Sequence, residues 1–209
     1  MKKPLAASAL RDPDRTRRRI LDAALKVFAA RGFAGARVDE IARQAATNKR
    51  MLYHYYGSKE GLFRAVLRHK LNERVKRVEA QVEGSDSASR MPLWFMQNCR
   101  DADWVRLLAW ESLQTAKDRV VDETGRRRFA RRTTARIRQK QRAGDLRADV
   151  PAAFLQLAKI SLTMFPMALP QLARIITGRS PRDPDFQRQY SRFLETISAA
   201  FRLPKGMAK

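Results

Sequence analysis

The chain has 209 residues, with 44 lysines and arginines against 21 aspartates and glutamates, a formal net charge of +23 at pH 7. A hydrophobic content of 44% is enough to build a core, which excludes wholesale disorder. The longest stretch without a charged residue, Ile160–Ala173, has 14 residues and two prolines, short of the roughly 20 apolar residues that span a membrane. The single cysteine, Cys99, cannot form an internal disulfide. We therefore expect a cytoplasmic protein with a polyanionic partner and no membrane contact.

The positive charge is spread along the whole chain. Residues 1–84 hold 20 basic and 9 acidic residues, and residues 85–209 hold 24 and 12. The charge therefore favours a nucleic acid partner but does not locate the binding site, which only a sequence motif can identify.

The first half of the chain reads as helices punctuated by glycine. Residues 1–14 are small, polar and basic, typical of a flexible arm. Apolar residues at helical spacing predict helices over 15–31, 38–45, 48–55 and 58–82. Ser58 is expected to cap the last of these, and the Gly-Ser-Asp-Ser run at 84–87 is the best candidate boundary.

The second half also reads as helix. The pattern predicts helices over 91–100, 104–113, 126–143, from 151 onward and over 186–201. Asp149 is expected to cap the helix that follows Pro151, and Pro166 and Pro170 are expected to kink or divide it. No segment shows sustained alternation of apolar and polar residues, so the expected fold is all-α.

The informative motif lies between Val38 and Phe63. Two short helices joined by a turn form a helix-turn-helix. Leu52 and Tyr56, four residues apart on the second helix, face inward. The outward set suits the major groove of DNA, with donors for phosphates and guanines and a methionine for thymine methyls: Lys49, Arg50, Met51, Tyr53 and His54.

The order of these residues resembles the DNA-binding domain of TetR-family transcriptional regulators over residues 15–67. The resemblance rests on Gly32-Phe33, Val38, Ile41-Ala42, Ala45, the run Leu52-Tyr53-His54-Tyr55-Tyr56, Ser58-Lys59-Glu60 and Leu62-Phe63. It implies a homodimer that binds a palindromic operator in double-stranded DNA and answers to an unknown small-molecule effector. It implies DNA contacts at Arg37, Thr47, Asn48, Lys49, Arg50, Met51, Tyr53, His54 and Lys59.

The sequence departs from the family pattern at three positions. Ala46 replaces the glycine that is usual in the turn, and Thr47 replaces a usual valine. Arg37 occupies the position where a serine or threonine often caps the second helix. Arg37 therefore loses the side-chain cap of the second helix but brings a positive charge that can contact a DNA phosphate. Lys49 and Arg50 suit phosphates as well as bases.

The resemblance divides the chain into an arm (1–14), a helix-turn-helix domain (15–58), a connecting helix (59–84) and a ligand-binding and dimerisation domain (85–209). A set of apolar and aromatic residues in the last part fits either a plain core or the wall of an effector pocket: Trp94, Phe95, Cys99, Trp104, Leu107, Trp110, Met164 and Phe165. The final helix carries an apolar stripe suited to a dimer interface: Phe186, Tyr190, Phe193, Leu194 and Ile197.

Two alternatives stand beside this interpretation, and an enzyme has no supporting motif. The helix Arg126–Arg142 holds nine basic and no acidic residues, which favours a solvated face but also fits an anionic ligand or DNA. A non-specific architectural nucleic-acid binder is the alternative function, against which stands the long apolar second half. No Ser-His-Asp or Cys-His signature and no phosphate-binding loop is evident, so no enzyme activity, metal or cofactor is expected.

Overall fold

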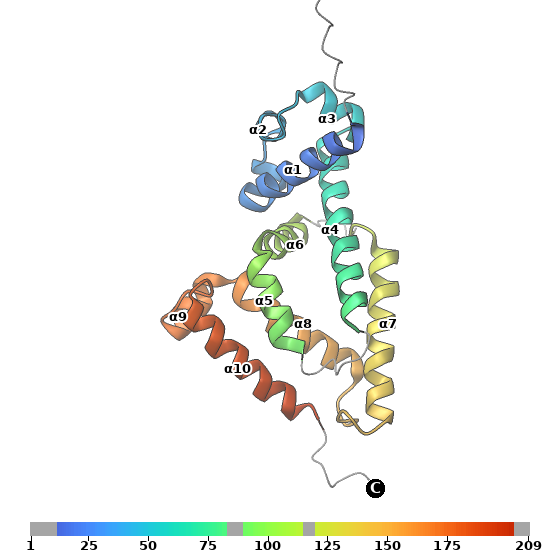
Figure 1. Cartoon of the computed structure of the whole chain (residues 1–209), viewed down its shortest axis with the longest axis vertical. Helices are drawn as coiled ribbons and strands as arrows, with labels where there is room; N and C mark the ends of the chain where they lie inside the picture. The colour runs from blue at the N-terminus through green and yellow to red at the C-terminus, as the bar shows by residue number, and fades with distance from the viewer. Residues whose placement is uncertain (1–11, 83–89, 115–119, 203–209) are drawn as a thin grey trace, which may run out of the picture. The chain divides into compact units, whose positions relative to one another are not determined.

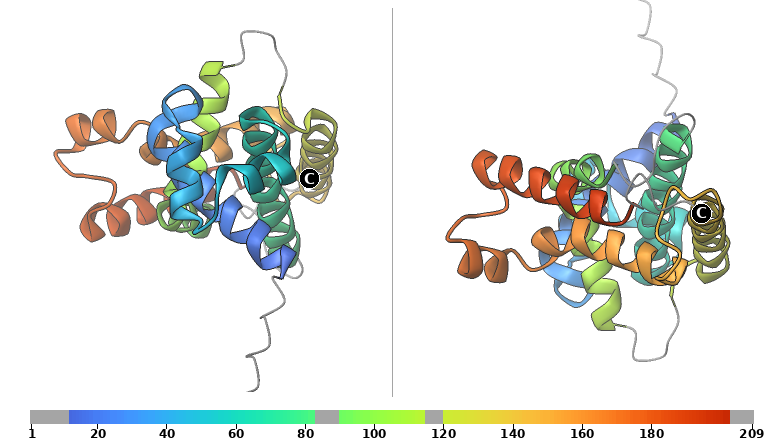
Figure 2. Two further views of the ribbon diagram at one scale, coloured as in Figure 1. Left: turned by 90° about the horizontal axis from the view of Figure 1, so that it is seen from above. Right: turned by 90° about the horizontal axis from the view of Figure 1, so that it is seen from below.

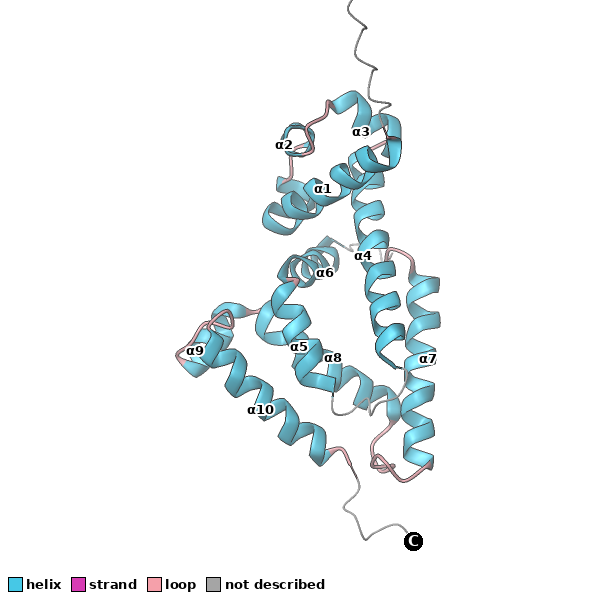
Figure 3. Cartoon of the chain, in the orientation of Figure 1, coloured by secondary structure: helices cyan, strands magenta, loops and turns pink. Residues whose placement is uncertain are grey.

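The computed structural model describes residues 12–82, 90–114 and 120–202, and its secondary structure there is α-helical (Figure 3). This confirms the expected all-α fold. The chain divides into two compact units between Leu67 and Arg68, inside a single helix. Most of the expected arm, and the expected boundary at 84–87, lie outside the described residues.

The first unit holds α1 (Pro13–Gly35), α2 (Val38–Gln44), α3 (Lys49–Tyr56) and the beginning of α4 (Lys59–Val82) (Figure 1). The Asp12 side chain caps α1 by accepting hydrogen bonds from the amides of Asp14 and Arg15, at 3.0 and 3.2 Å. Gly32, with φ of +68°, breaks the regular helix near the end of α1, where the sequence predicts a stop.

The core of this unit is built from the apolar stripes that the sequence predicts. Phe28, Phe33 and Phe63 form an aromatic cluster, with ring centroids 5.1 Å apart for Phe28 and Phe63 and 5.4 Å apart for Phe33 and Phe63. Further residues are buried from every helix of the unit: Ile20, Val27, Ile41, Leu52, Leu62, Val66 and Leu67. The start of α4 therefore belongs to the packed core of the helix-turn-helix unit.

The turn between α2 and α3 has the Schellman geometry that normally ends on glycine. The amide of Thr47 donates to the carbonyl of Ala42 at 3.0 Å, and the amide of Ala46 donates to that of Arg43 at 3.1 Å. Ala46 is held at φ +48°, in the left-handed region that favours glycine. The alanine that departs from the family pattern is therefore under backbone strain.

A second tight corner joins α3 to α4. Gly57, at φ +72°, ends α3, and the Ser58 hydroxyl caps α4 by accepting from the amide of Gly61 at 3.0 Å, as the sequence predicts. A Cβ atom at Gly61 would lie 2.0 Å from the carbonyl oxygen of Tyr56. The corner can therefore close only around a glycine at position 61.

The second unit contains the rest of α4 and the helices α5 (Met91–Arg100), α6 (Ala102–Gln114), α7 (Glu123–Arg142), α8 (Ala152–Ala168), α9 (Pro170–Thr177) and α10 (Pro184–Ala200). Within it, α8 packs against α5, α6, α7 and α9, and α5 also packs against α10 (Figure 1). One core cluster joins α5 to α9 and α10: Met91, Phe95, Ala173, Phe186 and Leu194. A smaller one joins α7 to α8 through Ile137, Leu146, Ala152 and Leu155.

The two prolines of the apolar stretch behave differently. Pro166 lies inside the last turns of α8, whereas Pro170 begins α9, which is bent by 88° from α8. No single described helix is long and apolar enough to span a membrane. Among the described helices, only α8 and α9 counted together as a bent pair have the length and composition of such a span. Both views of Figure 2 show the chain leaving α9 through a loop and returning as α10.

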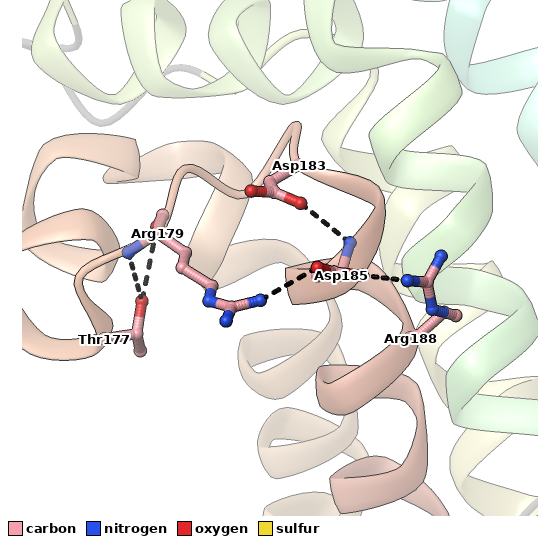
Figure 4. A network of polar contacts seen from close by, with 5 residues as sticks. All are labelled: Thr177, Arg179, Asp183, Asp185 and Arg188. Carbon is pink, nitrogen blue, oxygen red and sulfur yellow. Dashed lines mark hydrogen bonds and ion pairs between the residues drawn. The ribbon is translucent and has the colours of Figure 1, made fainter.

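A polar network fixes that return (Figure 4). The Asp183 carboxylate caps α10 by accepting from the amide of Asp185 at 2.8 Å. Asp185 in turn pairs with Arg179 at 3.2 Å and with Arg188. The Thr177 hydroxyl accepts from the amide of Arg179 at 3.4 Å. The end of α9 and the start of α10 are thus joined by local hydrogen bonds.

The expected cap on α8 is wrong. Pro151 occupies the N-cap position and makes no side-chain capping bond. Asp149 instead accepts a hydrogen bond from Arg147, 3.0 Å from its Nε, and this bond lowers the pKa of the Asp149 carboxyl. The Asp149 carboxylate thus binds Arg147 and not the amides at the start of α8.

We expect Ala46→Gly to stabilise the α2–α3 turn. The left-handed conformation costs an alanine about 1–2 kcal/mol, and glycine's extra unfolded-state entropy returns part of this, leaving a gain of about 0.5–1 kcal/mol. Hydrogen–deuterium exchange of the α2–α3 amides should slow by about two- to fivefold. As a control, Ala30→Gly, at an exposed position of α1 with ordinary helical geometry, should speed local exchange. Faster exchange in Ala46→Gly would contradict the strain.

Candidate functional site

The inner face of α3 is fixed to the scaffold. Leu52 is only 2% exposed, and the Tyr56 hydroxyl donates to the carbonyl oxygen of Arg17 on α1 at 3.2 Å. Burial raises the pKa of Tyr56 against the opposing effect of the Arg17 charge. The Arg17 guanidinium also lies over the ring of Tyr55, 5.1 Å from its centroid. Sequence reasoning missed Arg17, which holds α3 through two contacts.

The opposite face of α3 is open to solvent. Arg50, Tyr53 and His54 are exposed, with Tyr53 retaining 47% of its accessible surface, and Met51 is half-buried. These are the residues that the sequence predicts to face outward. The helix therefore presents cationic, aromatic and hydrogen-bonding groups together on one side, the combination that reads a DNA groove.

The first turn of α3 is capped by one of the predicted contact residues. The Asn48 side chain accepts a hydrogen bond from the amide of Met51 at 3.0 Å. Asn48 thus sets the start of the recognition helix, and Thr47 beside it is half-buried in the turn. Arg37, exposed before α2, makes no side-chain capping bond, as its departure from the usual serine or threonine predicts.

Two predicted lysines have partners within the unit. Lys49 pairs with Asp39 on α2, with 2.7 Å between its Nζ and the carboxylate. Lys59, in the first turn of α4, donates to the carbonyl oxygen of Ala34 at 3.3 Å, and its ammonium lies 4.7 Å from the centroid of the Phe33 ring. The contacts of Lys59 leave its other N–H donors for a phosphate, whereas the Lys49 ammonium is held by a carboxylate.

The predicted pocket residues separate into different environments. Phe95 belongs to the α5–α9–α10 core, and Cys99 packs against that core. Burial raises the pKa of the Cys99 thiol to about 11. Phe165 is 41% exposed, so its side chain is largely outside any enclosed wall, contrary to the expectation. Leu107 is fully buried, and Trp110 and Met164 are half-buried.

Two residues of this set lie against cations, Trp94 against the buried Lys159 and Trp104 against the half-buried Arg74. The ammonium of Lys159 lies 5.1 Å from the Trp94 ring centroid, and the guanidinium of Arg74 lies 5.4 Å from that of Trp104. A separate groove of about 490 Å³ between α5 and α10 contains none of the eight predicted residues; Met96, Pro184, Gln187, Arg188, Ser191, Arg192 and Glu195 line it. Among the described residues, no group of three His, Cys, Asp or Glu side chains could hold a metal ion.

The predicted dimer stripe needs correction. Phe186 is 5% exposed and Leu194 is fully buried inside the unit, so neither side chain is available to a partner. Tyr190 is half-buried, and its hydroxyl donates to the carbonyl oxygen of Leu162 on α8 at 3.0 Å. Ile197 is half-buried against the same core, and only Phe193 remains exposed, at 44%. The stripe binds α10 to its own protomer.

Exposed apolar side chains lie mainly on α8 and α9 instead. Those on α8 include Phe154, Leu157 and Ile160, and those on α9 are Leu172, Ile175 and Ile176. Sequence reasoning missed those on α8 because this helix is apolar on nearly all sides, so periodicity does not tell its buried face from its exposed one.

The basic helix α7 buries only Ile137. Arg126 donates to the buried Glu111 from its two terminal guanidinium nitrogens, Nη1 and Nη2, at 2.8 and 3.0 Å, and Arg132 pairs with Glu79. Arg128, Arg131, Arg136, Arg138 and Arg142 are exposed and have no ion pair within the described ranges. Most of the helix thus agrees with a solvated cationic face.

Family models match both units. The model described as "Bacterial regulatory proteins, tetR family" matches residues 20–66, and that described as "Tetracyclin repressor-like, C-terminal domain" matches residues 93–199. The HTH-type transcriptional repressor SCO4008 of Streptomyces coelicolor is 32% identical over 170 residues, which cover 81% of this chain and 88% of that protein.

Two further comparisons agree. The HTH-type transcriptional repressor NicS of Pseudomonas putida is 39% identical over 105 residues, 48% of this chain and 50% of that protein. The crystal structure of SCO4942 from Streptomyces coelicolor superposes with a TM-score of 0.68 at 26% identity, covering 87% of this chain and 97% of that one.

The helix-turn-helix with its exposed α3, the second unit that is helical over its described residues and the two family matches together place the chain in the class of DNA-binding transcriptional regulators. Within this class, the chain belongs to the TetR family. Its relatives are transcriptional regulators and not enzymes.

We expect Asp39→Asn to tighten DNA binding. The Lys49–Asp39 pair must open for Lys49 to reach DNA, and the Asp39 carboxylate, whose side chain is 70% exposed, repels phosphates. Because an exposed pair is worth up to about 1 kcal/mol, the affinity should rise by about two- to fivefold, as measured by fluorescence anisotropy on a selected operator. Asp22→Asn, which removes an exposed carboxylate from α1, is the control. An unchanged or weaker affinity in Asp39→Asn would show that the pair does not restrain Lys49.

Proposed function

We propose that the protein is a ligand-responsive transcriptional repressor that binds a palindromic operator as a homodimer. One observation carries the proposal: the outer face of α3 presents Arg50, Tyr53 and His54 to solvent while Leu52 and Tyr56 fix its inner face. The relatives SCO4008 and NicS are named repressors, which supports the direction of regulation, and this role implies a cytoplasmic location.

In this proposal α3 enters the major groove. Arg50 and Met51, near its N-terminus, are suited to base edges, with the guanidinium donating to a guanine and the thioether contacting a thymine methyl. Tyr53 and His54 contact phosphates, and Arg37 and Lys59 hold the backbone on either side. Lys49 joins them once its pair with Asp39 opens. Thr47 and Asn48 act by shaping the turn and capping α3.

The dimer interface is proposed to form through the exposed apolar face of α8 together with Phe193 of α10. Phe154, Leu157 and Ile160 follow one another at three-residue intervals and are 64%, 59% and 46% exposed. An apolar surface of this kind marks a protein–protein contact. Two copies joined here would carry two recognition helices, and a two-fold axis between them matches a palindrome.

The response to ligand is proposed to travel along α4. This helix is continuous from Lys59 to Val82, with Leu62 and Phe63 in the core of the first unit and Arg74 in the second. An effector that binds the second unit and moves α4 changes the geometry of the first. The ligand releases DNA only to the extent that it binds the released state more tightly.

Selection from a random pool of duplexes, followed by anisotropy titration of the winning sequence, tests the DNA-binding function. We expect a palindromic site bound at least about a thousandfold more tightly than random duplex at the same salt concentration. Arg50→Ala should lower this specific affinity by about tenfold or more, whereas Arg131→Ala on the solvated face of α7 should leave it unchanged. Equal affinity for all duplexes would instead indicate a non-specific architectural binder.

Leu157→Glu should separate the protomers. It sets a charge in the proposed apolar interface, where burying an unpaired carboxylate is strongly unfavourable. We expect sedimentation to show a monomer and affinity for the palindromic site to fall by more than tenfold. The control, Leu113→Glu on α6, changes a side chain that is 76% exposed and should remain dimeric. A Leu157→Glu protein that stays dimeric would contradict this interface.

A further inference from the structure

The second unit contains a polar cluster buried between α4, α5 and α8. We call Arg74, Trp94, Asn98 and Lys159 the donor cluster. Asn98 is 1% exposed and Lys159 is 5% exposed, although both are polar and Lys159 is charged. Buried polar groups in a helical core are kept only where they are satisfied or serve a purpose, so each contact matters.

Hydrogen bonds fix half of the donor cluster. Arg74 Nη2 donates to Asn98 Oδ1 at 2.6 Å, and Asn98 Nδ2 donates to the carbonyl oxygen of Thr163 at 2.9 Å. The side-chain amide of Asn98, on α5, therefore links α4 to α8 and holds the Arg74 guanidinium in one orientation.

The other half of the donor cluster lies one helical turn away. Trp94 precedes Asn98 by four residues on α5, and Lys159 precedes Thr163 by four residues on α8. Residues at this spacing are neighbours on a helix surface. The Lys159 ammonium, 5.1 Å from the Trp94 ring centroid, forms the contact next to the Asn98–Thr163 bond. The Arg74–Asn98 contact and the Lys159–Trp94 contact thus lie one helical turn apart along α5 and α8.

Two N–H groups of the donor cluster have no acceptor. Arg74 Nη1 and Trp94 Nε1 are buried and make no hydrogen bond. The carboxylate of Asp101 is 3.9 Å from Arg74 Nη1, and Lys70 lies closer to it, at 2.9 Å. Burial lowers the pKa of Arg74, against the effect of Asp101, but an arginine stays protonated. Both donors that lack a hydrogen bond therefore require an acceptor, and one of them belongs to a guanidinium.

We infer that the effector of this regulator is an organic anion, an apolar molecule bearing a carboxylate, whose oxygens accept hydrogen bonds from Arg74 Nη1 and Trp94 Nε1. The inference rests on the proposed ligand response and names the chemistry of its ligand. Charge-assisted hydrogen bonds from arginine to carboxylate are among the strongest available to a protein. Trp104 is 4% exposed and its ring centroid lies 5.4 Å from the Arg74 guanidinium, so an apolar body held at Arg74 would lie next to an aromatic ring.

The test compares matched ligands that differ only in charge. Isothermal titration calorimetry measures ligand binding to the full chain without DNA. The first series has a rigid aromatic body: 2-naphthoate, its neutral amide 2-naphthamide and the cation 2-naphthylmethylamine. The second series, decanoate and decanamide, has a flexible apolar chain. We expect at least one carboxylate to bind about tenfold or more tightly than its amide, and the cation not to bind. Equal binding of acid and amide, preference for the cation, or no carboxylate bound below 1 mM would overturn the inference.

A matched pair of variants assigns the preference to the donor cluster. Trp94→Phe keeps the aromatic body and removes only the N–H, so carboxylate affinity should fall by about tenfold or more. Arg74→Gln should abolish the preference for acid over amide. Arg18→Gln makes the same charge change as Arg74→Gln at an exposed position of α1, in the other unit, and should leave affinity unchanged. An unaltered affinity in Trp94→Phe would contradict the assignment.

The outcomes separate this inference from the function it rests on. A protein that selects a palindrome but shows no preference for carboxylates refutes the anionic effector alone. A protein that binds carboxylates through the donor cluster but no particular DNA sequence refutes the regulator and leaves an anion-binding site.

Discussion

The DNA-binding unit depends on the way α3 is held by one face only. Leu52 fills the core, the Tyr56 hydroxyl bonds to the Arg17 carbonyl, and the corner that follows closes because position 61 lacks a side chain. These contacts take the inner half of an eight-residue helix that would not be stable alone. Rigid attachment on one side is what leaves Arg50 and its neighbours free on the other, in a fixed orientation.

Electrostatics refine this arrangement. Lys49 is paired with Asp39, and Lys59 is held by a carbonyl oxygen and the ring of Phe33, so both cations are ordered before any phosphate arrives. Ordering a long side chain in advance lowers the entropic cost of binding. In the proposed DNA interface the pair with Asp39 acts in the opposite direction, since Lys49 has to leave Asp39 to bind a phosphate. Because phosphate contacts are independent of sequence, the balance between such contacts bears on the affinity for any duplex, and the preference for one sequence is left to the base-facing residues.

The second unit shows where reasoning from sequence fails. Phe95, Phe165 and Trp94 belong to one aromatic set in the sequence, yet the first lies in the core, the second is exposed and the third contacts a buried lysine. The role of Asn98 in linking α4 to α8 could not be predicted, because a single asparagine in an apolar helix forms no recognisable sequence pattern. Hydrophobicity alone does not distinguish a core from a pocket or an interface.

The sequence by itself determined the all-helical fold, the helix-turn-helix and the outward face of α3, because these follow from local periodicity, capping and short-range spacing. Only the tertiary structure decided that Phe186 and Leu194 face inward, that Asp39 holds Lys49, and that Arg74 and Trp94 each bury a donor without a hydrogen bond. These facts depend on contacts between helices distant in sequence, and a helix that is apolar on nearly all sides, such as α8, does not reveal which of its sides a neighbour will cover.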